Sequence, residues 1–467
     1  MRATPAAQEI VERALRLSRG EGCIVVLEDR RSANLRWAGN TLTTNGVMNG
    51  RTLTVISILG ESRGAAAGVV SRSGVSADDD IEAVVRLSED AARAAGPAED
   101  AQPLSDGSTA AGQGDFAEPP GDTSAGVFAS FAAALGEAFG RARAADRELF
   151  GFAEHDVTTT YLGSSTGIRL RHEQPAGRVE VTGKADGRTR STWLGQSTRD
   201  FADVDVTTLE AEVNRRLDWS RRTIELAPGR YDTVLPPAAV ADLMIYLYWS
   251  TGARDASEGR SVFSKPGGGT RIGDQLTDRP LRLWSDPSAA GLESIPFVAV
   301  TASTGSSSVF DDGLPLAATD WIRDGQLAAL MQSRHSAELT DLPYTPAVDN
   351  LLLGEAGATG SVDDLVSGVE RGLLLTCLWY IREVDPQTLL LTGLTRDGVF
   401  LVENGEVVAG VNNFRFNESP VDLLGRVSTV GATARTLPRE WNDWFTRTAM
   451  PPLRVPDFNM STTSDAQ

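Results

Sequence analysis

Hydrophobic residues recur at helical spacing in three stretches near the start of the chain. The stripes are Ile10, Val11, Ala14 and Leu15; Ile81, Val84, Val85 and Ser88, after a start at Asp78–Asp80; and Phe128, Phe131, Ala132, Leu135 and Phe139. Because residues three and four apart share one face of a helix, each stripe predicts an amphipathic helix with that face on a core.

Short runs typical of β-strands lie between and after these helices. They are Cys23–Leu27, Asn34–Ala38, Leu53–Leu59, Val157–Leu162, Gly167–Arg171 and Arg178–Thr182. Asn49-Gly50 stands just before the third run, and this dipeptide predicts a hairpin turn there. Helices and strands in this order predict an α+β arrangement for the first part of the chain.

A polar connection and a change of pattern divide the sequence. Residues 96–124 are rich in Gly, Pro, Ser, Asp and Ala, which predicts a flexible connection. A second unit is expected from residue 228, with a strand at Tyr231–Leu235 and a helix from Pro236-Pro237 to Gly252.

Beyond Gly252 the pattern is mainly β. The runs are Phe297–Ala302, Gly325–Gln332, Gly372–Trp379, Leu389–Thr392, Val399–Val402 and Val407–Val411, the last two joined by an Asn404-Gly405 turn. We therefore expect an α+β protein with an N-terminal domain over residues 1–227 and a mainly antiparallel β domain over residues 228–460. Residues 461–467 are expected to form a disordered tail.

Charge and composition narrow the function classes. The 467 residues carry a formal net charge of −19, with 41% hydrophobic and 23% charged residues, which is typical of a soluble globular protein. Such a charge disfavours binding to nucleic acid or to an anionic membrane. The N-terminus has no apolar signal core and no window is apolar enough to span a bilayer, so a cytoplasmic protein is expected. The two cysteines, Cys23 and Cys377, are expected to be reduced and buried.

The three histidines do not form a recognisable metal site. His172-Glu173 is followed by Gln174-Pro175, which breaks a helix, so His172 is expected to be an exposed strand residue. His155 stands between two acidic residues and is expected to be solvated. His335 follows a β-type run and is expected at a surface or an interface.

Asp311-Asp312 is the one adjacent carboxylate pair that suggests chemistry. It could serve acid–base catalysis or bind a cation. Because neighbouring residues in a strand point to opposite faces, capping of a turn is the favoured interpretation.

Several segments, taken in order, resemble the TldD/PmbA peptidase family over nearly the whole chain. The segments are Leu35–Asn40, Tyr161–Ile168, Gly229–Leu235 with Ala241 and Leu243, Asp311–Gly313, Ile322–Leu327, Gly372–Thr376 and Val402–Glu406. The resemblance implies the two-domain fold of this family and an activity on peptides.

The sequence departs from the family where the active TldD-type subunit carries a His-Glu-x-x-x-His motif for zinc. Counting back from Ser261–Ser264, which resembles the segment after the motif, places Met244, Ile245 and Trp249 at the three positions. The active subunit also takes a cysteine ligand near its C-terminus, and here no cysteine follows Cys377. The resemblance therefore implies a TldE-like subunit with no catalytic and no metal-binding residues, whose zinc lies in a TldD-like partner.

The same resemblance implies that unfolded or modified peptides are the substrate, held as an added strand against a sheet. Trp379–Asp385 departs from the family's glycine-rich stretch, so it either lines the substrate cavity or forms a strand with its aromatic face in the core. Candidate cavity residues are Asp311, Asp312, Tyr380 and Arg382. Two alternatives stay open: a homodimeric hydrolase with a non-zinc site that uses Asp311, Asp312 or Cys377, and a homo-oligomeric peptide-binding protein.

Overall fold

The computed structural model describes residues 5–60, 63–75, 78–107 and 115–465. These residues form three β-sheets with helices packed against them, and the expected α+β class is confirmed. No helix among the described residues is long and apolar enough to cross a membrane.

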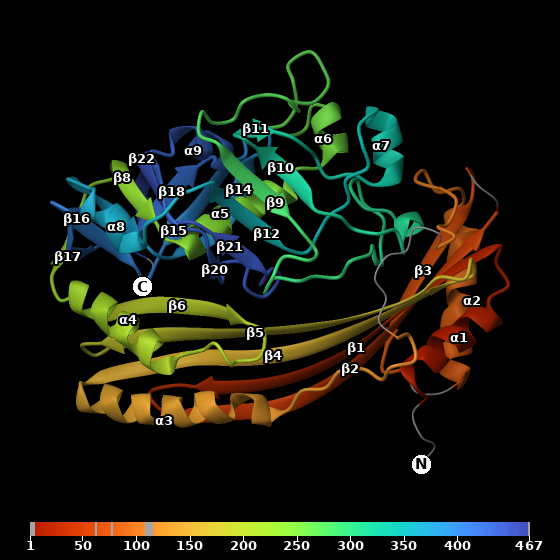
Figure 1. Cartoon of the computed structure of the whole chain (residues 1–467), viewed down its shortest axis with the longest axis horizontal. Helices are drawn as coiled ribbons and strands as arrows, with labels where there is room; N and C mark the ends of the chain where they lie inside the picture. The colour runs from red at the N-terminus through yellow and green to blue at the C-terminus, as the bar shows by residue number, and fades with distance from the viewer. Residues whose placement is uncertain (1–4, 61–62, 76–77, 108–114, 466–467) are drawn as a thin grey trace.

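The first sheet is antiparallel throughout, with the strand order β3-β2-β1-β4-β5-β6. Its strands are β1 (Gly22–Trp37), β2 (Leu42–Leu59), β3 (Ala66–Ser73), β4 (Arg147–Ser164), β5 (Arg169–Ala185) and β6 (Arg190–Thr198). The long strands run beneath the C-terminal half of the chain (Figure 1). Cys23–Leu27 and Asn34–Ala38, expected as two strands, fall on one continuous strand, β1, which ends at Trp37.

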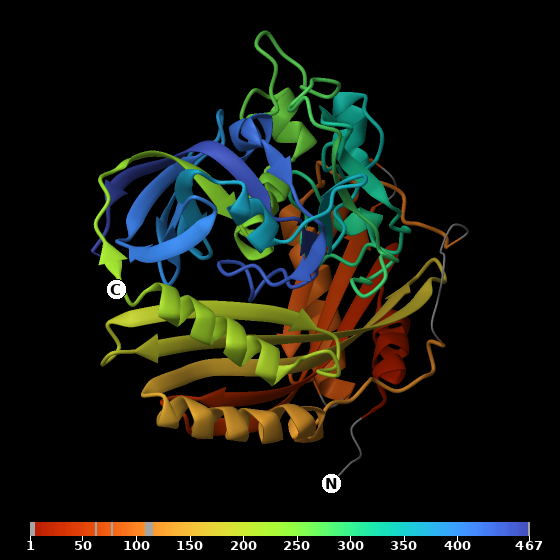
Figure 2. The same ribbon diagram turned by 60° about the vertical axis from the view of Figure 1, so that its left-hand side comes forward.

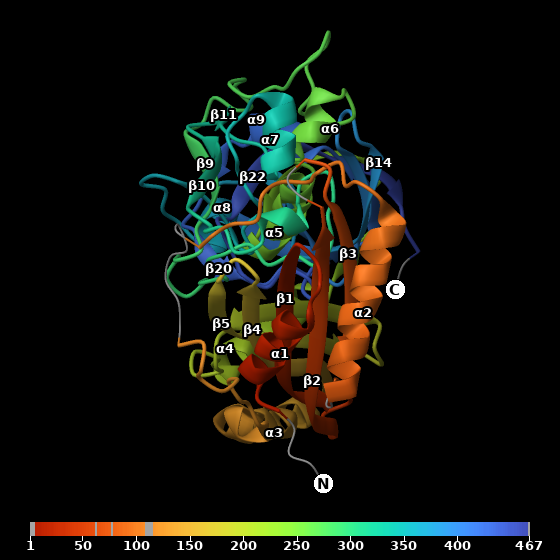
Figure 3. The same ribbon diagram turned by 90° about the vertical axis from the view of Figure 1, so that its right-hand side faces the viewer.

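Side-chain alternation gives this sheet two different faces. Odd-numbered residues of β1 point to the helices, which are α1 (Ala7–Leu17), α2 (Asp78–Ala95), the short η1 (Ala125–Phe128), α3 (Ala129–Ala144) and α4 (Val206–Trp219). Helices α1 and α2 cover one end of this face and α3 and α4 the other (Figures 2 and 3). Even-numbered Ile24 and Val26 pack on Phe297 and Phe310 from the C-terminal half.

The hairpin between β1 and β2 turns at Gly39 and Asn40, so the expected turn at Asn49-Gly50 is wrong. Asn49 and Gly50 pair within the ladder with Arg31 and Arg30. Gly39 and Asn40 both have positive φ, 56° and 62°, as a tight hairpin turn requires. The Asn40 side chain also bonds the backbone of Arg147 and Leu149, which fixes the turn on the neighbouring strand.

The C-terminal half contains two further sheets, in which most neighbouring strands are antiparallel. One has the order β11-β10-β9-β12-β21-β20: β9 (Leu281–Ser285), β10 (Thr319–Arg323), β11 (Gln326–Leu327), β12 (Leu351–Glu355), β20 (Ala434–Thr436) and β21 (Thr448–Met450). The other has ten strands: β7 (Thr223–Ile224), β8 (Gly229–Leu235), β13 (Arg371–Leu375), β14 (Leu378–Asp385), β15 (Leu390–Thr395), β16 (Val399–Glu403), β17 (Glu406–Val411), β18 (Phe414–Glu418), β19 (Thr429–Val430) and β22 (Leu453–Thr463). The Asn404-Gly405 turn joins β16 and β17 as expected.

Helix α5 (Pro237–Trp249) lies in the largest core of the molecule, with contacts to β8, β20 and β21. It is apolar on nearly every side, as a helix enclosed by protein must be. The smaller helices are α6 (Ala253–Ser257), η2 (Val309–Asp311), α7 (Arg334–Thr340), α8 (Val362–Ser367) and α9 (Pro420–Arg426).

Two expectations about polar segments need correction. The tail does not begin at residue 461, because β22 continues to Thr463 and its residues pair with β18. In the connection, the described residues 96–107 and 115–124 contain no helix or strand, but Ala101 and Thr123 are buried and Leu104 packs on a core cluster. The described parts of this polar segment therefore pack against the protein at these positions. Residues 466–467 of the expected tail lie outside the described residues.

Candidate functional site

A large cleft lies between the polar face of the first sheet and the loop over residues 439–447. Its volume is about 720 Å³, and a neighbouring hollow of about 700 Å³ shares Glu154, Arg178, Asn442 and Asp443 with it. A cleft of this size between two parts of a fold is the usual place for a ligand.

Strand alternation explains why the floor of the cleft is polar. Glu28 of β1, Thr160 of β4 and His172 of β5 lie side by side in the ladders and point to the same face. Their odd-numbered neighbours, such as Leu27 and Tyr161, are buried under the helices on the opposite face. The same strands are therefore apolar towards the helices and charged towards the cleft.

Charges on the floor are arranged as linked ion pairs. Arg30 contacts Asp156 at 2.6 Å, and Arg178 contacts Glu154 at 3.1 Å. Arg178 also reaches the opposite wall, where Asp443 lies 2.5 Å away. This arginine therefore joins the sheet to the 439–447 loop.

Burial changes the ionisation of two groups on the floor. It lowers the pKa of His172, whose Nε2 lies 3.1 Å from the Gln174 amide oxygen. It raises the pKa of Glu28, although nearby Arg30 opposes that rise. A neutral imidazole and a carboxylate that protonates more readily than usual give the floor both hydrogen-bond donors and acceptors.

The 439–447 loop is held in place by helix α5. The Asp242 carboxylate accepts hydrogen bonds from the backbone N–H groups of Arg439 and Glu440, and the Trp441 indole N–H donates to the Asp242 carbonyl oxygen at 2.8 Å. On the cleft side of the loop, Trp444 is 78% exposed. An aromatic side chain so open to solvent is available for contact with a ligand or another chain.

Asp311 and Asp312, expected near a substrate cavity, lie buried away from this cleft. Asp311 accepts from the backbone N–H of Arg334 at 3.0 Å and pairs with its guanidinium at 2.6 Å. Asp312 accepts from the Val300 N–H at 2.7 Å. Their bonds to the Arg334 and Val300 backbone resemble the capping role that the sequence favoured, but in the interior instead of at a surface turn.

Tyr380 and Arg382 occupy a different place, on the edge strand β14 of the ten-stranded sheet. Arg382 and Glu383 line a separate cavity of about 460 Å³. Tyr380 is 55% exposed, so the alternative of an aromatic face in the core is wrong for this residue. Its φ of 52° coincides with a register irregularity between Trp379 and Arg382, as in a β-bulge. The structure thus does not bring the two predicted pairs together. Asp311 and Asp312 are buried beside Arg334 and Val300, whereas Tyr380 and Arg382 lie on the edge strand β14.

Two of the three histidines differ from expectation. His155 is buried, with Nδ1 2.7 Å from Thr123 Oγ1 and Nε2 2.8 Å from the Arg199 carbonyl oxygen, so the expected solvated position is wrong. His172 lines the cleft and is not fully exposed. The acidic neighbours of His155 in the sequence point to the opposite face of β4, which the local pattern did not reveal.

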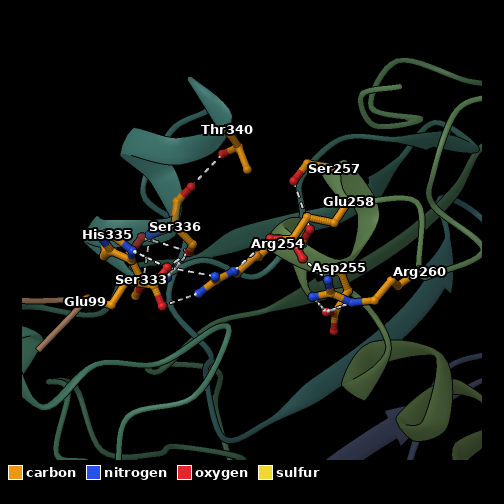
Figure 4. A network of polar contacts seen from close by, with 10 residues as sticks. All are labelled: Glu99, Arg254, Asp255, Ser257, Glu258, Arg260, Ser333, His335, Ser336 and Thr340. Atoms are coloured by element: carbon orange, nitrogen blue, oxygen red, sulfur yellow. Dashed lines mark hydrogen bonds and ion pairs between the residues drawn. The ribbon is translucent and has the colours of Figure 1, made fainter. Parts of the chain in front are cut away.

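His335 belongs to a network that fastens the connection to the C-terminal half (Figure 4). Its Nε2 lies 3.8 Å from the carboxylate of Glu99. Arg254 on helix α6 binds the same carboxylate through both terminal nitrogens, at 2.8 and 3.2 Å. These contacts assign His335 to an internal docking surface. Among the described residues, no three His, Cys, Asp or Glu side chains cluster as a metal site would require.

The architecture defines a class of protein that has been seen before. TldE from Thermococcus kodakarensis shares the fold with a TM-score of 0.76 at 14% identity, over 97% of this chain and 99% of that one. Two proteins described as candidate modulators of DNA gyrase match with TM-scores of 0.73. The one from Thermotoga maritima is 14% identical, over 97% of this chain and 99% of its own. The one from Bacteroides thetaiotaomicron is 15% identical, over 98% of each chain.

Sequence comparison leads from this class to a family. Residues 228–462, half of the chain, match the family described as the PmbA/TldA metallopeptidase C-terminal domain. The chain belongs to this family. No curated protein matches the sequence.

Proposed function

We propose that this chain is a non-catalytic, TldE-like subunit that assembles with a TldD-like zinc peptidase to degrade or trim unfolded or modified peptides. The observation that carries the proposal is the face of α5 at the expected motif positions. Met244 and Ile245 have no exposed surface, and Trp249 packs on Trp441 with ring centroids 5.1 Å apart. Apolar side chains at these positions supply no nitrogen, oxygen or thiolate ligand.

The other donors nearby also do not fit zinc. Both carboxylate oxygens of Asp242 are engaged by backbone N–H groups. Cys377 is buried beside Trp193 and Leu437, and burial raises the pKa of its thiol far above the usual range. A cysteine binds a metal ion as the thiolate, so this buried thiol, which resists deprotonation, is unsuited to that role. We therefore assign the zinc to the partner subunit.

The proposal that this chain binds peptide is based on the large cleft and on the edge of strand β2 beside it. From Leu42 to Gly50, β2 pairs with β1 and with no other strand among the described residues. Thr44, Met48 and Gly50 of this edge line the two hollows. An extended peptide added here would continue the cleft floor through backbone hydrogen bonds, whatever its sequence. We place the assembly in the cytoplasm, which agrees with the two buried free thiols.

The alternatives have less support. A hydrolase based on Asp311 and Asp312 would need a free carboxylate facing a cavity, whereas Asp311 is paired with Arg334 and Asp312 is enclosed. A homo-oligomeric peptide-binding protein would use the same cleft, so it differs from the main proposal in its partner and in the absence of cleavage.

Co-expression with the TldD-type protein of the same genome tests the proposal. The pair, purified through a tag on this chain, should contain zinc and cleave an unstructured peptide, while this chain alone should do neither. Replacing the motif glutamate of the partner by glutamine is the matched control and should abolish cleavage without separating the subunits. Zinc or cleavage in the lone chain would refute the proposal.

The β2 edge is tested by the peptide itself. Methylation of every second backbone nitrogen removes the N–H donors of one peptide edge and leaves the side chains unchanged. One of the two methylation registers should weaken binding to the pair, because an added strand needs its donors. If both methylated peptides bind as tightly as the parent peptide, the peptide does not bind as a strand added to the β2 edge.

A further inference from the structure

Three aromatic side chains enclose one side of the cavity beside β14. Tyr246 and Trp249 come from the last turns of α5, and Trp441 comes from the 439–447 loop. Their ring centroids are 5.7 Å apart for Tyr246 and Trp441, and 5.1 Å apart for Trp249 and Trp441. The rings meet at 58° and 69°, so they form the sides of a box. Trp249 is 42% exposed, which leaves the box open to solvent.

The charged side chains that line this cavity are not all paired within the described part of the chain. Arg260 lies 2.6 Å from Asp255, and Arg382 lies 3.2 Å from Glu440, so both arginines of the lining are already paired. Among the described residues, Glu383 has no basic side chain within ion-pair distance. Partial burial, followed by the charge of Asp385, raises the pKa of Glu383. The cavity therefore combines electron-rich ring faces with a carboxylate that forms no ion pair among the described residues.

We propose that this aromatic box binds an ammonium group carried by a peptide, either a lysine side chain or the amino terminus. Ring faces attract cations through their quadrupole, and aromatic boxes with a nearby carboxylate suit primary and methylated ammonium groups. The chain's net charge of −19 also favours the approach of a cation. The inference does not rest on the proposed assembly, because every residue of the box belongs to this chain.

An apolar ligand is the main competing occupant. It would gain from the same rings but nothing from Glu383, and it would leave that carboxylate without a partner. A carboxylate ligand would meet the charge of Glu383 directly. Removal of the charge on Glu383 should therefore weaken the binding of a cation, leave that of an apolar ligand unweakened and strengthen that of a carboxylate.

The first measurement uses short acetylated peptides with one central residue varied, titrated into the lone chain and followed by calorimetry. Trimethyllysine should bind about tenfold more tightly than its neutral tert-butyl isostere, which has the same shape without the charge. Lysine should bind more tightly than norleucine. A peptide without lysine but with a free amino terminus separates the second source of the ammonium group from the first.

Matched variants test whether the trimethyllysine peptide binds at the aromatic box. Trp249→Leu should weaken trimethyllysine binding about tenfold, and Trp249→Phe should restore part of it because an aromatic face returns. Glu383→Gln should weaken binding of the cation but not of the isostere. Glu406→Gln is the control, because it removes an exposed charge from β17 near the opposite end of the sheet order.

Circular dichroism confirms that each variant is folded before its affinity is interpreted. Equal binding of trimethyllysine and its isostere would overturn the proposal. So would unchanged affinity in the folded Trp249→Leu variant. Either result leaves the zinc and cleavage test of the assembly unaffected, so failure of the box and failure of the proposed function are distinguishable.

Discussion

The carboxylate of Asp242 on helix α5 accepts a hydrogen bond from the backbone N–H of Glu440, 198 residues later in the chain, at 2.8 Å. The second carboxylate oxygen accepts from the Arg439 N–H at 3.2 Å. Burial raises the pKa of Asp242, while these two N–H groups oppose that rise. This buried side chain therefore helps to anchor the loop that forms both the cleft wall and one side of the aromatic box.

Removal of this carboxylate should loosen the loop. Asp242→Ala leaves two N–H groups without an acceptor and should lower the free energy of unfolding by about 1–3 kcal/mol. Asp242→Asn keeps one acceptor and should lie between alanine and the parent. Urea denaturation gives the values, and exposed Asp457, where asparagine tolerates the φ of 57°, supplies Asp457→Asn as a neutral control. Equal midpoints for Asp242→Ala and Asp457→Asn would contradict the anchoring role.

Gly68 of β3 should tolerate no side chain, because helix α2 crosses it closely. A Cβ at this position would overlap the backbone of Ser88 and Ala92. Gly68→Ala should therefore cost about 1–3 kcal/mol by forcing the helix off the sheet. Gly50 of β2 is the matched control, since no atom lies within 4 Å of the place where a Cβ would stand and its φ is not positive. Thermal unfolding should leave Gly50→Ala close to the parent; a similar loss in both variants would mean that strand propensity, not the contact, is responsible.

The large helices and the α+β class could be predicted from the sequence because their signals are local. Stripes such as Ile81, Val84 and Val85 are set by the 3.6-residue period alone, and all three lie on the face of α2 that is buried against the sheet. The β1–β2 turn was missed because two dipeptides, Gly39-Asn40 and Asn49-Gly50, both allow positive φ. The choice between them depends on the pairing of Asn40 with Leu149, which is 109 residues away.

The cleft was missed for a related reason. Its floor consists of polar residues on alternate positions of β1, β4 and β5, a pattern that also describes an ordinary solvated face. The loop that carries Trp444, anchored by the Asp242 contact, forms a wall opposite this face and so makes it part of a cleft. A side chain such as Arg178 has no local signal for a role, because its partner Asp443 is distant in the sequence.

The contact between Arg254 and Glu99 should control how firmly the connection is docked (Figure 4). Arg254→Ala removes both bonds to Glu99 and should increase amide hydrogen exchange in residues 96–104. Global stability should change little, because the pair is exposed and screened by solvent. Arg260→Ala, which removes only ion pairs with nearby Asp255 and Glu258, is the control. Faster exchange in both variants, or in neither, would assign the docking to the apolar contacts of Ala101 and Leu104.

Asp312 should make the protein less stable as the pH rises. Its carboxyl is 2% exposed and accepts one bond from the Val300 N–H, while Oδ2 has no hydrogen-bond partner among the described residues. Burial, followed by the charge of Asp311, raises its pKa well above the ordinary value. The folded protein thus holds a proton on Asp312 over a pH range in which the unfolded chain, with a pKa of about 3.9, has released it.

The sign of the effect follows from this proton. Stability from protonated Asp312 is fully present below about pH 4 and is lost, by at most about 1.4 kcal/mol per pH unit, as the pH rises towards the folded pKa. Asp312→Asn has no proton to lose, so its free energy of unfolding should improve relative to the parent as the pH rises from about 4 to about 7. Asp311→Asn is the contrast: it breaks the pair with Arg334 and should destabilise the protein throughout this range. Guanidinium denaturation at several pH values measures the free energy of unfolding of both variants. If the difference in this free energy between Asp312→Asn and the parent does not vary with pH, Asp312 is ionised in the folded protein and the prediction is wrong.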